Sequence, residues 1–112
     1  MDCYPNCIAT DLYGANLTGD DLTGVNLYYS QLDGVNFTLA NLYGANLAAS
    51  SMVGANLGSA NLTYANLTGA DLSGADLSGA TLTGATLTAA NLTGVNWLYT
   101  TCPNGTITYT GC

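Results

Sequence analysis

Two kinds of side chain in this sequence could do chemistry near neutral pH, namely seven aspartates and four cysteines. They are Asp2, Asp11, Asp20, Asp21, Asp33, Asp71 and Asp76, together with Cys3, Cys7, Cys102 and Cys112. Paired carboxylates suit glycoside hydrolysis, and thiols serve as nucleophiles or metal ligands. The chain, however, contains no Lys, Arg, His or Glu. It therefore offers no imidazole or amine as a general base, and the composition predicts that the protein is not an enzyme.

The formal net charge of −7 excludes further classes of function. No cation is available to contact phosphate, which excludes direct nucleic-acid binding. A zinc site needs about four converging ligands, and neither cysteine pair has a His nearby, so we expect no metal and no cofactor. No apolar run approaches the roughly 18 residues of a membrane span. The opening residues MDCYPNCIAT also lack the charged and apolar regions of a signal peptide, so none is expected within this chain.

Most of the sequence is a repeat of five residues, which is clearest in ADLSGADLSGATLTGATLT, from Ala70 to Thr88. The frame runs unbroken through 18 units from Thr10 to Tyr99, with Leu at the centre of 15 units and Gly at the end of 11. A period of five gives no apolar stripe on a helix and would send successive Leu side chains to opposite faces of an unbroken strand. It fits a short strand segment followed by a corner, with every Leu pointing toward one axis.

The number of units per coil follows from which residues would stack. Four units, a period of 20, place five glycines in one corner column, whereas three units put Tyr, Leu, Ser or Ala into every corner column. The glycines of that column are Gly14, Gly34, Gly54, Gly74 and Gly94. The same period stacks the inward hydroxyls of Thr10, Ser30 and Ser50, where they could hydrogen-bond each other. The sequence therefore favours a four-sided coil.

Runs such as ANLTGADLSGADLSGATLTGATLT resemble pentapeptide-repeat proteins, and the resemblance covers 90 of the 112 residues. It implies an all-β fold, a right-handed quadrilateral parallel β-helix of about 4.5 coils. The expected single domain spans residues 1–112, with an N-terminal cap at 1–9, the repeats at 10–99 and a C-terminal cap at 100–112. Asp20, Ser30 and Ser50 depart from the family pattern at the inward small position, as do Thr81 and Thr86 where Asn or Asp is usual.

The cysteines lie only in the expected caps. About 4.5 coils spaced about 4.8 Å apart separate the two groups by about 22 Å, too far for a disulfide between them. We therefore expect the bridges Cys3–Cys7 and Cys102–Cys112, which imply an extracytoplasmic location such as the periplasm, an organelle lumen or the exterior. The tail TTCPNGTITYTGC contains the turn signal Pro103-Asn104-Gly105, so the C-terminal cap is either a hairpin or a distorted coil.

The acidic residues suggest one sharper hypothesis, because some members of the family resemble duplex DNA in shape and charge and bind DNA gyrase. DNA carries about 13 charges over 22 Å, whereas this chain offers seven in all. Asp20 points inward in the frame, where neutral protonation or the open first coil would lessen its burial cost. Asp71 and Asp76 fall on adjacent walls of a convex body without a cleft, so we expect no catalytic carboxylate pair.

Outward-facing tyrosines are the remaining candidates for function. Tyr28, Tyr29, Tyr43 and Tyr64 map to two neighbouring walls, and an exposed aromatic patch of this kind marks contact with a protein or a carbohydrate. The best reading is an exported, non-enzymatic structural or binding module, monomeric or weakly oligomeric, with no identifiable ligand. The alternatives are a cytoplasmic DNA-mimicking regulator of gyrase and a self-assembling fibre subunit, which the stapled ends argue against.

Overall fold

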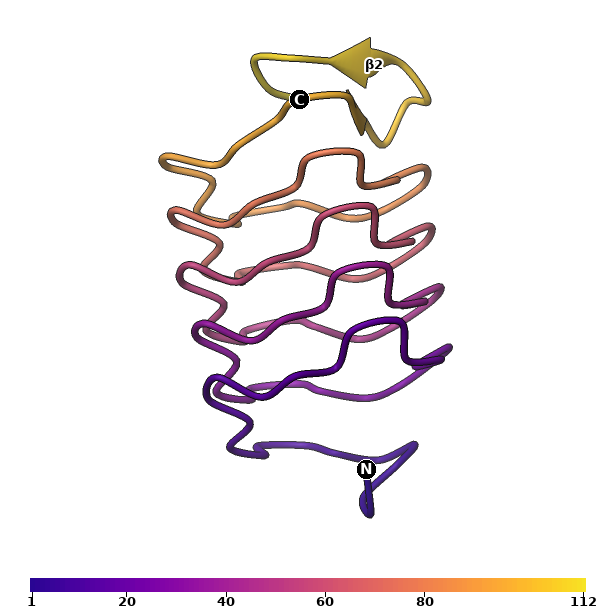
Figure 1. Ribbon diagram of the computed structural model, residues 1–112, viewed down its shortest axis with the longest axis vertical. Helices are drawn as coiled ribbons and strands as arrows, with labels where there is room; N and C mark the ends of the chain where they lie inside the picture. The colour runs from indigo at the N-terminus through magenta and orange to yellow at the C-terminus, as the bar shows by residue number, and fades with distance from the viewer.

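The computed structural model describes all residues, 1–112, as a stack of coils with the two termini at opposite ends (Figure 1). Parallel bridges join each polar residue before a central Leu to its counterpart 20 positions later, from Asn6↔Asn26 to Thr81↔Thr101. Each coil therefore contains four units of five residues, and the predicted period of 20 is confirmed. Of the 71 backbone hydrogen bonds, 69 lie outside the two regular strands, so the coil-to-coil ladders and the corner turns hold the fold together.

Each corner is a tight turn closed from the residue after the unit back to the central residue, as in Ala15 N–H to Leu12 O at 2.9 Å. The last residue of every unit has a positive φ, which is why Gly occupies this place most often. Seven units carry another residue there, including Tyr29 with φ 58° and Tyr64 with φ 58°. The corner geometry is therefore imposed by the stack even where the side chain disfavours it.

The coil has four walls, which we name after their first central residue. These are the Leu12 wall (Leu12, Leu32, Met52, Leu72, Leu92), the Leu17 wall (Leu17, Phe37, Leu57, Leu77, Trp97), the Leu22 wall (Leu22, Leu42, Leu62, Leu82) and the Leu27 wall (Leu27, Leu47, Leu67, Leu87). The central residues from Leu27 to Leu82 are fully buried, and the small inward residues between them complete one continuous core. The inward assignment of the frame is confirmed.

One expectation about inward polar residues is wrong. The hydroxyls of Thr10 and Ser30 donate to the main-chain oxygen of Cys7, at 2.7 and 3.0 Å, rather than to each other. Ser50 likewise donates to Leu47 O, the carbonyl of its own corner turn, at 2.6 Å. Of the two ways expected to lessen the burial cost of Asp20, the structure shows the open first coil, because Asp20 is exposed.

The two ends differ in construction. At the N-terminal end, a Cys3–Cys7 disulfide places Cys7 under the Leu27 column, where Cys7 is 1% exposed. At the C-terminal end, β1 (Thr100–Thr101) pairs antiparallel with β2 (Ile107–Thr108), which folds back over the last coil (Figure 1). A Cys102–Cys112 disulfide closes the loop. The C-terminal cap is thus a hairpin, one of the two expected forms.

Thr101 joins the last coil to the C-terminal hairpin. It bridges Thr81 in the coil below and Ile107 in the hairpin above, so the hairpin is seated directly on the Leu22 wall. We call residues 100–112 the hairpin cap. None of the segments forms a helix with the length and apolarity needed to cross a membrane.

Candidate functional site

The aspartates of the repeats are mainly structural acceptors. In most units the Asn or Asp before the central residue accepts a hydrogen bond from the backbone N–H two positions later, as Asp76 does from Ser78 at 2.8 Å. This Asx-turn contact satisfies an N–H that would otherwise be free at the corner. Asp11, Asp21 and Asp71 make the same contact. The recurrent Asn or Asp followed by Thr or Ser was the sequence signal for this role.

Asp33 takes the same role across two coils. Ser51 stands where Asn or Asp is usual, and the Asp33 carboxylate from the coil below replaces it by accepting from Val53 N–H at 2.8 Å. The Ser51 hydroxyl also donates to Asp33, at 2.6 Å. This compensation could not be found from the repeat pattern, because the donor and acceptor come from neighbouring coils.

Hydrogen bonding lowers the pKa of two carboxyls. The Thr23 hydroxyl, with the Thr23 N–H, holds the pKa of Asp21 below its ordinary value, and the Ser73 N–H and hydroxyl do the same for Asp71. Both bonds favour the ionised form, because the negatively charged oxygen of a carboxylate is a stronger acceptor than the oxygen of a neutral carboxyl group. Such carboxylates are poor general acids near neutral pH.

The structure keeps the catalytic candidates apart. Asp71 and Asp76 belong to the Leu12 and Leu17 walls, and each is bound to its own turn. No group of three or more His, Cys, Asp or Glu side chains lies together as a metal site would require. All four cysteines are in disulfides.

The four tyrosines form two aromatic pairs on the outside of the coil. The rings of Tyr43 and Tyr64 meet edge to face with centroids 5.6 Å apart, and those of Tyr28 and Tyr29 are tilted with centroids 6.3 Å apart. All four are exposed, Tyr29 and Tyr64 by 69% and 61%. We call these four residues the tyrosine patch, as expected on two neighbouring walls, the Leu22 and Leu27 walls.

Tyr64 is held in place by the coil above it. Its ring lies over Gly84, at the equivalent corner one coil later, where a Cβ would overlap the ring. Gly84 has a φ of 69°, so its lack of a side chain serves both the turn and this contact. The Tyr43–Tyr64 pair is therefore supported by the contact between the two rings and by the corner at Gly84.

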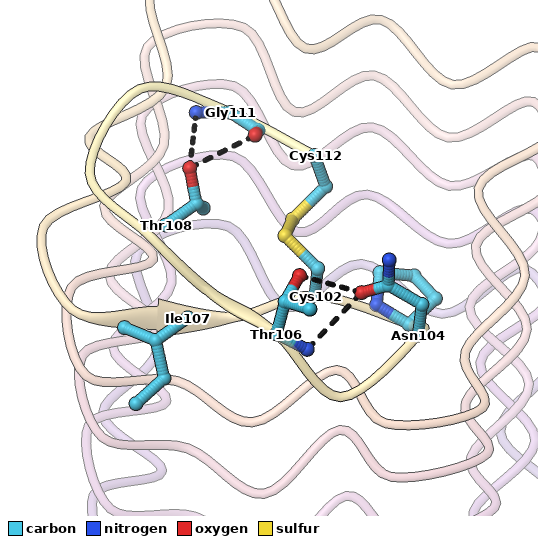
Figure 2. Close-up of a pocket in the computed structure, with 8 residues that line it drawn as sticks. Cys102, Asn104, Thr106, Ile107, Thr108, Gly111 and Cys112 are labelled. Atoms are coloured by element: carbon cyan, nitrogen blue, oxygen red, sulfur yellow. Dashed lines mark hydrogen bonds between the residues drawn. A yellow bond between two sulfur atoms is a disulfide. The ribbon is translucent and has the colours of Figure 1, made fainter.

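The hairpin cap contains a pocket of about 380 Å³ (Figure 2). The Cys102–Cys112 disulfide forms part of its wall, and its polar groups are bound to one another. Asn104 accepts from the Thr106 N–H and hydroxyl, and the Thr108 hydroxyl donates to Gly111 O, as Figure 2 shows. The pocket contains no ionisable side chain. This pocket was not predicted from the sequence, because it forms only when the tail folds back on itself.

A family model described as pentapeptide repeats matches residues 6–38, 40–79 and 60–96 of the chain. Among solved structures, a pentapeptide-repeat protein from the thylakoid lumen of Arabidopsis thaliana is 30% identical with a TM-score of 0.60. The match covers 82% of this chain and 61% of the Arabidopsis protein, so the chain spans less than two thirds of that relative.

Two further structures match with lower TM-scores. The pentapeptide-repeat protein Rfr23 from the cyanobacterium Cyanothece is 29% identical with a TM-score of 0.40, covering 84% of this chain and 88% of its own. QnrB1, a plasmid-mediated fluoroquinolone resistance protein, is 22% identical with a TM-score of 0.42, covering 79% and 58%. No curated protein matches the sequence significantly.

Proposed function

The chain belongs to the pentapeptide-repeat family, whose members are right-handed quadrilateral β-helices and generally non-enzymatic, and on that premise we propose that it is an exported binding module. Its coil, of about 4.5 turns with the same hand, acts as a rigid support. The tyrosine patch is its contact surface, and the partner is a protein or a carbohydrate.

The exposed, fixed Tyr43–Tyr64 pair is the observation that carries this proposal. Tyrosine supplies apolar area and a hydroxyl with few rotatable bonds, and is enriched at protein contacts for that reason. Most outward positions of the repeats are Asn, Asp, Thr or Ser, and exposed apolar side chains elsewhere include Tyr13, Leu39 and a second pair, Tyr99–Tyr109, with centroids 5.0 Å apart. The tyrosine patch differs from these in bringing two aromatic pairs to two neighbouring walls of the repeats, and a partner bound there would gain apolar contact from several tyrosines at once.

The absence of catalysis is supported by the use made of the carboxylates. Asp11, Asp21, Asp71 and Asp76 are acceptors in their own turns, and Asp33 serves the turn of Val53. Removing any one of them from its turn would cost a backbone hydrogen bond, so the coil employs these groups for folding.

Export is supported by the two disulfides, since such bridges persist in oxidising compartments. The relative from the thylakoid lumen is compatible with it. The test is a free-thiol count, by alkylation and intact mass, on protein taken from its native source. We expect no free thiol; four free thiols would refute export.

The binding role is tested by comparing two double variants, each of which removes two exposed apolar side chains. Tyr43→Ala with Tyr64→Gly removes the aromatic pair, and Gly suits the positive φ at residue 64. Tyr13→Ala with Leu39→Gly is the control, because Tyr13 is 72% exposed on the Leu12 wall and Leu39 is 63% exposed at a corner with a φ of 61°. Binding is measured on a glycan array and by chemical cross-linking in an extract of the native source. We expect the variant of the tyrosine patch to lose the partner that the control retains. Equal retention by both proteins would refute the patch.

The alternative, a regulator of DNA gyrase, rests on the acidic surface. Its seven carboxylates are about half as dense as the charges of DNA over the same length. A supercoiling assay separates the two proposals: we expect no effect at tens of micromolar, and inhibition or protection of gyrase would favour the regulator.

A further inference from the structure

We propose that the two ends of the coil are complementary docking surfaces for a second copy of this chain, stacked head to tail, and that the hairpin cap holds them apart. The inference rests on which backbone groups each end leaves unpaired. It does not involve the tyrosine patch.

The last coil ends in an unpaired ladder. In every lower coil the N–H of a central residue donates to the coil above, as Leu72 does to Asn91 O at 2.8 Å. The N–H groups of Leu87, Leu92 and Trp97 have no such partner. Leu87 and Leu92 are also only partly buried. This end therefore presents both strand edges and apolar side chains.

The first coil presents the complementary groups. The N–H and C=O of Asn6, Asp11 and Asn16 make no backbone hydrogen bond. If a second copy continued the ladder, its Asn6, Asp11 and Asn16 would take the places 20 residues beyond Thr86, Asn91 and Asn96 of the first copy. A second copy shifted by 100 residues, five coils, would thus pair Leu92 N–H with its Asp11 O and Trp97 N–H with its Asn16 O. The free groups of one end match those of the other in kind and order.

The charges favour this orientation over contact between two N-terminal ends. Asp2, Asp11, Asp20 and Asp21 lie at the N-terminal end, whereas no charged side chain follows Asp76. Two N-terminal ends would therefore repel each other, and two C-terminal ends would stop at a dimer. A head-to-tail contact is heterologous and continues without limit.

The small area of the end-to-end contact explains why the hairpin cap is enough to prevent stacking. The cross-section of 23 by 22 Å gives each end at most about 500 Å², and a stacked pair would bury about 1,000 Å², the lower limit of specific interfaces. Such a contact needs its full ladder of hydrogen bonds, and the loss of one wall would abolish it.

The hairpin cap blocks the hydrogen-bonding edge of the Leu22 wall. Cys102 N–H donates to Thr106 O at 2.7 Å, and β2 occupies the edge of β1 that Asp21 of a second copy would otherwise pair with. The cap also reaches the neighbouring Leu17 wall, where Gly111 lies against the Trp97 ring. Residues 1–5 of the second copy would fall in the same space. Head-to-tail contact therefore requires that the cap be displaced, and the Cys102–Cys112 bridge holds it in place.

The test opens the cap by two routes. Cys102→Ala with Cys112→Ser removes the bridge and leaves no reactive thiol. The second route uses the Cys3→Ala, Cys7→Ser protein, whose one remaining bridge is Cys102–Cys112. Dithiothreitol passes two electrons and two protons to that bridge and closes to its own cyclic disulfide. Without reductant, this second protein is the matched control, with one bridge lost and the cap still closed.

Sedimentation velocity across a concentration series, with negative-stain microscopy, gives the readout. We expect both opened proteins to grow past the dimer into rods one coil wide, lengthening by about 24 Å per copy. The wild type and the unreduced control stay discrete. Leu92→Asp in the Cys102→Ala, Cys112→Ser protein places a carboxylate against the acidic N-terminal end of the next copy and abolishes growth. Circular dichroism verifies that each protein keeps its fold.

Three results would overturn the proposal. One is that the opened proteins, still folded, remain monomers at every concentration. Another is that growth stops at a dimer, which indicates a contact between like ends. The third is that Leu92→Asp leaves the assembly unchanged, which indicates a contact elsewhere on the coil.

Discussion

Leu72 and Leu92 occupy equivalent places on the Leu12 wall, one coil apart, within the near-identical units ADLSG and ANLTG. Leu72 is fully buried and its N–H donates to Asn91 O, whereas Leu92 is partly exposed and its N–H has no partner. The difference arises entirely from what lies above each residue. In this molecule, whether a unit is buried and whether its backbone is hydrogen-bonded depend on the units 20 residues away. The sequence of the unit itself determines which side chains point inward and where the corner turn falls.

The strongest test of this contrast is a buried charge. Leu67→Asp should cost about 4 kcal/mol or more of the free energy of unfolding, enough to unfold most of a small domain, because it leaves an unpaired carboxylate among fully buried Leu and Ala. Leu92→Asp should cost about 1 kcal/mol, since the carboxylate reaches water. Urea unfolding followed by circular dichroism measures both. Thr68→Asp, on the exposed face, serves as the control, and equal losses for Leu67 and Thr68 would show that the inward frame is wrong.

A smaller effect follows from deleting apolar volume. Leu72→Ala should destabilise the protein by about 3 kcal/mol, through lost burial and a cavity closed on all sides. Leu92→Ala should cost about 1 kcal/mol, because solvent already reaches that site. The midpoints of urea unfolding at an unchanged slope would give the two values. Similar losses at both sites would mean that the hairpin cap seals the last coil.

A gain of stability is expected where the turn lacks its usual acceptor. Thr81 replaces the common Asn or Asp, and Thr83 N–H has no side-chain acceptor, unlike Thr63 N–H, which donates to Asn61 at 3.1 Å. Thr81→Asn should therefore raise the free energy of unfolding by about 0.5–1 kcal/mol. Asn61→Thr is the reciprocal change and should lose a similar amount. An unchanged midpoint in both would show that water satisfies this N–H equally well.

The smallest effect concerns pH. Hydrogen bonds from Ser73 lower the pKa of Asp71 in the folded state, relative to about 3.9 in the unfolded chain. Its stabilising contribution is therefore complete above about pH 4 and is lost as the pH falls through the folded pKa. The Asp71 side chain is partly exposed to solvent, which weakens its hydrogen bonds. Its contribution to the shift in melting temperature between about pH 5 and pH 2 should therefore be slight. Asp71→Asn keeps the acceptor oxygen and should flatten that dependence; an unchanged slope would assign it to other carboxylates.

Much of the fold could be predicted because the repeat is local and redundant. The alternation around Leu12 or Leu72 sets which side chains point inward, and the stacked glycines set the period of 20. The two disulfides could be paired because the length of the repeat keeps the cysteine groups apart. The candidate site was less predictable: the frame placed Tyr43 and Tyr64 outside, but their edge-to-face contact depends on the corner of the next coil.

The sequence by itself determined the five-residue unit, its inward and outward faces, and the absence of every basic side chain. Only the tertiary structure decided that the Asp33 carboxylate completes the turn of Val53, that Asp20 stays in water, and that the tail folds back as a hairpin onto Thr101. The physical reason is the range of the interactions. Side-chain alternation and turn preference act within one unit, whereas coil-to-coil hydrogen bonds and the exposure of the ends depend on residues about 20 positions away, or on there being no further coil.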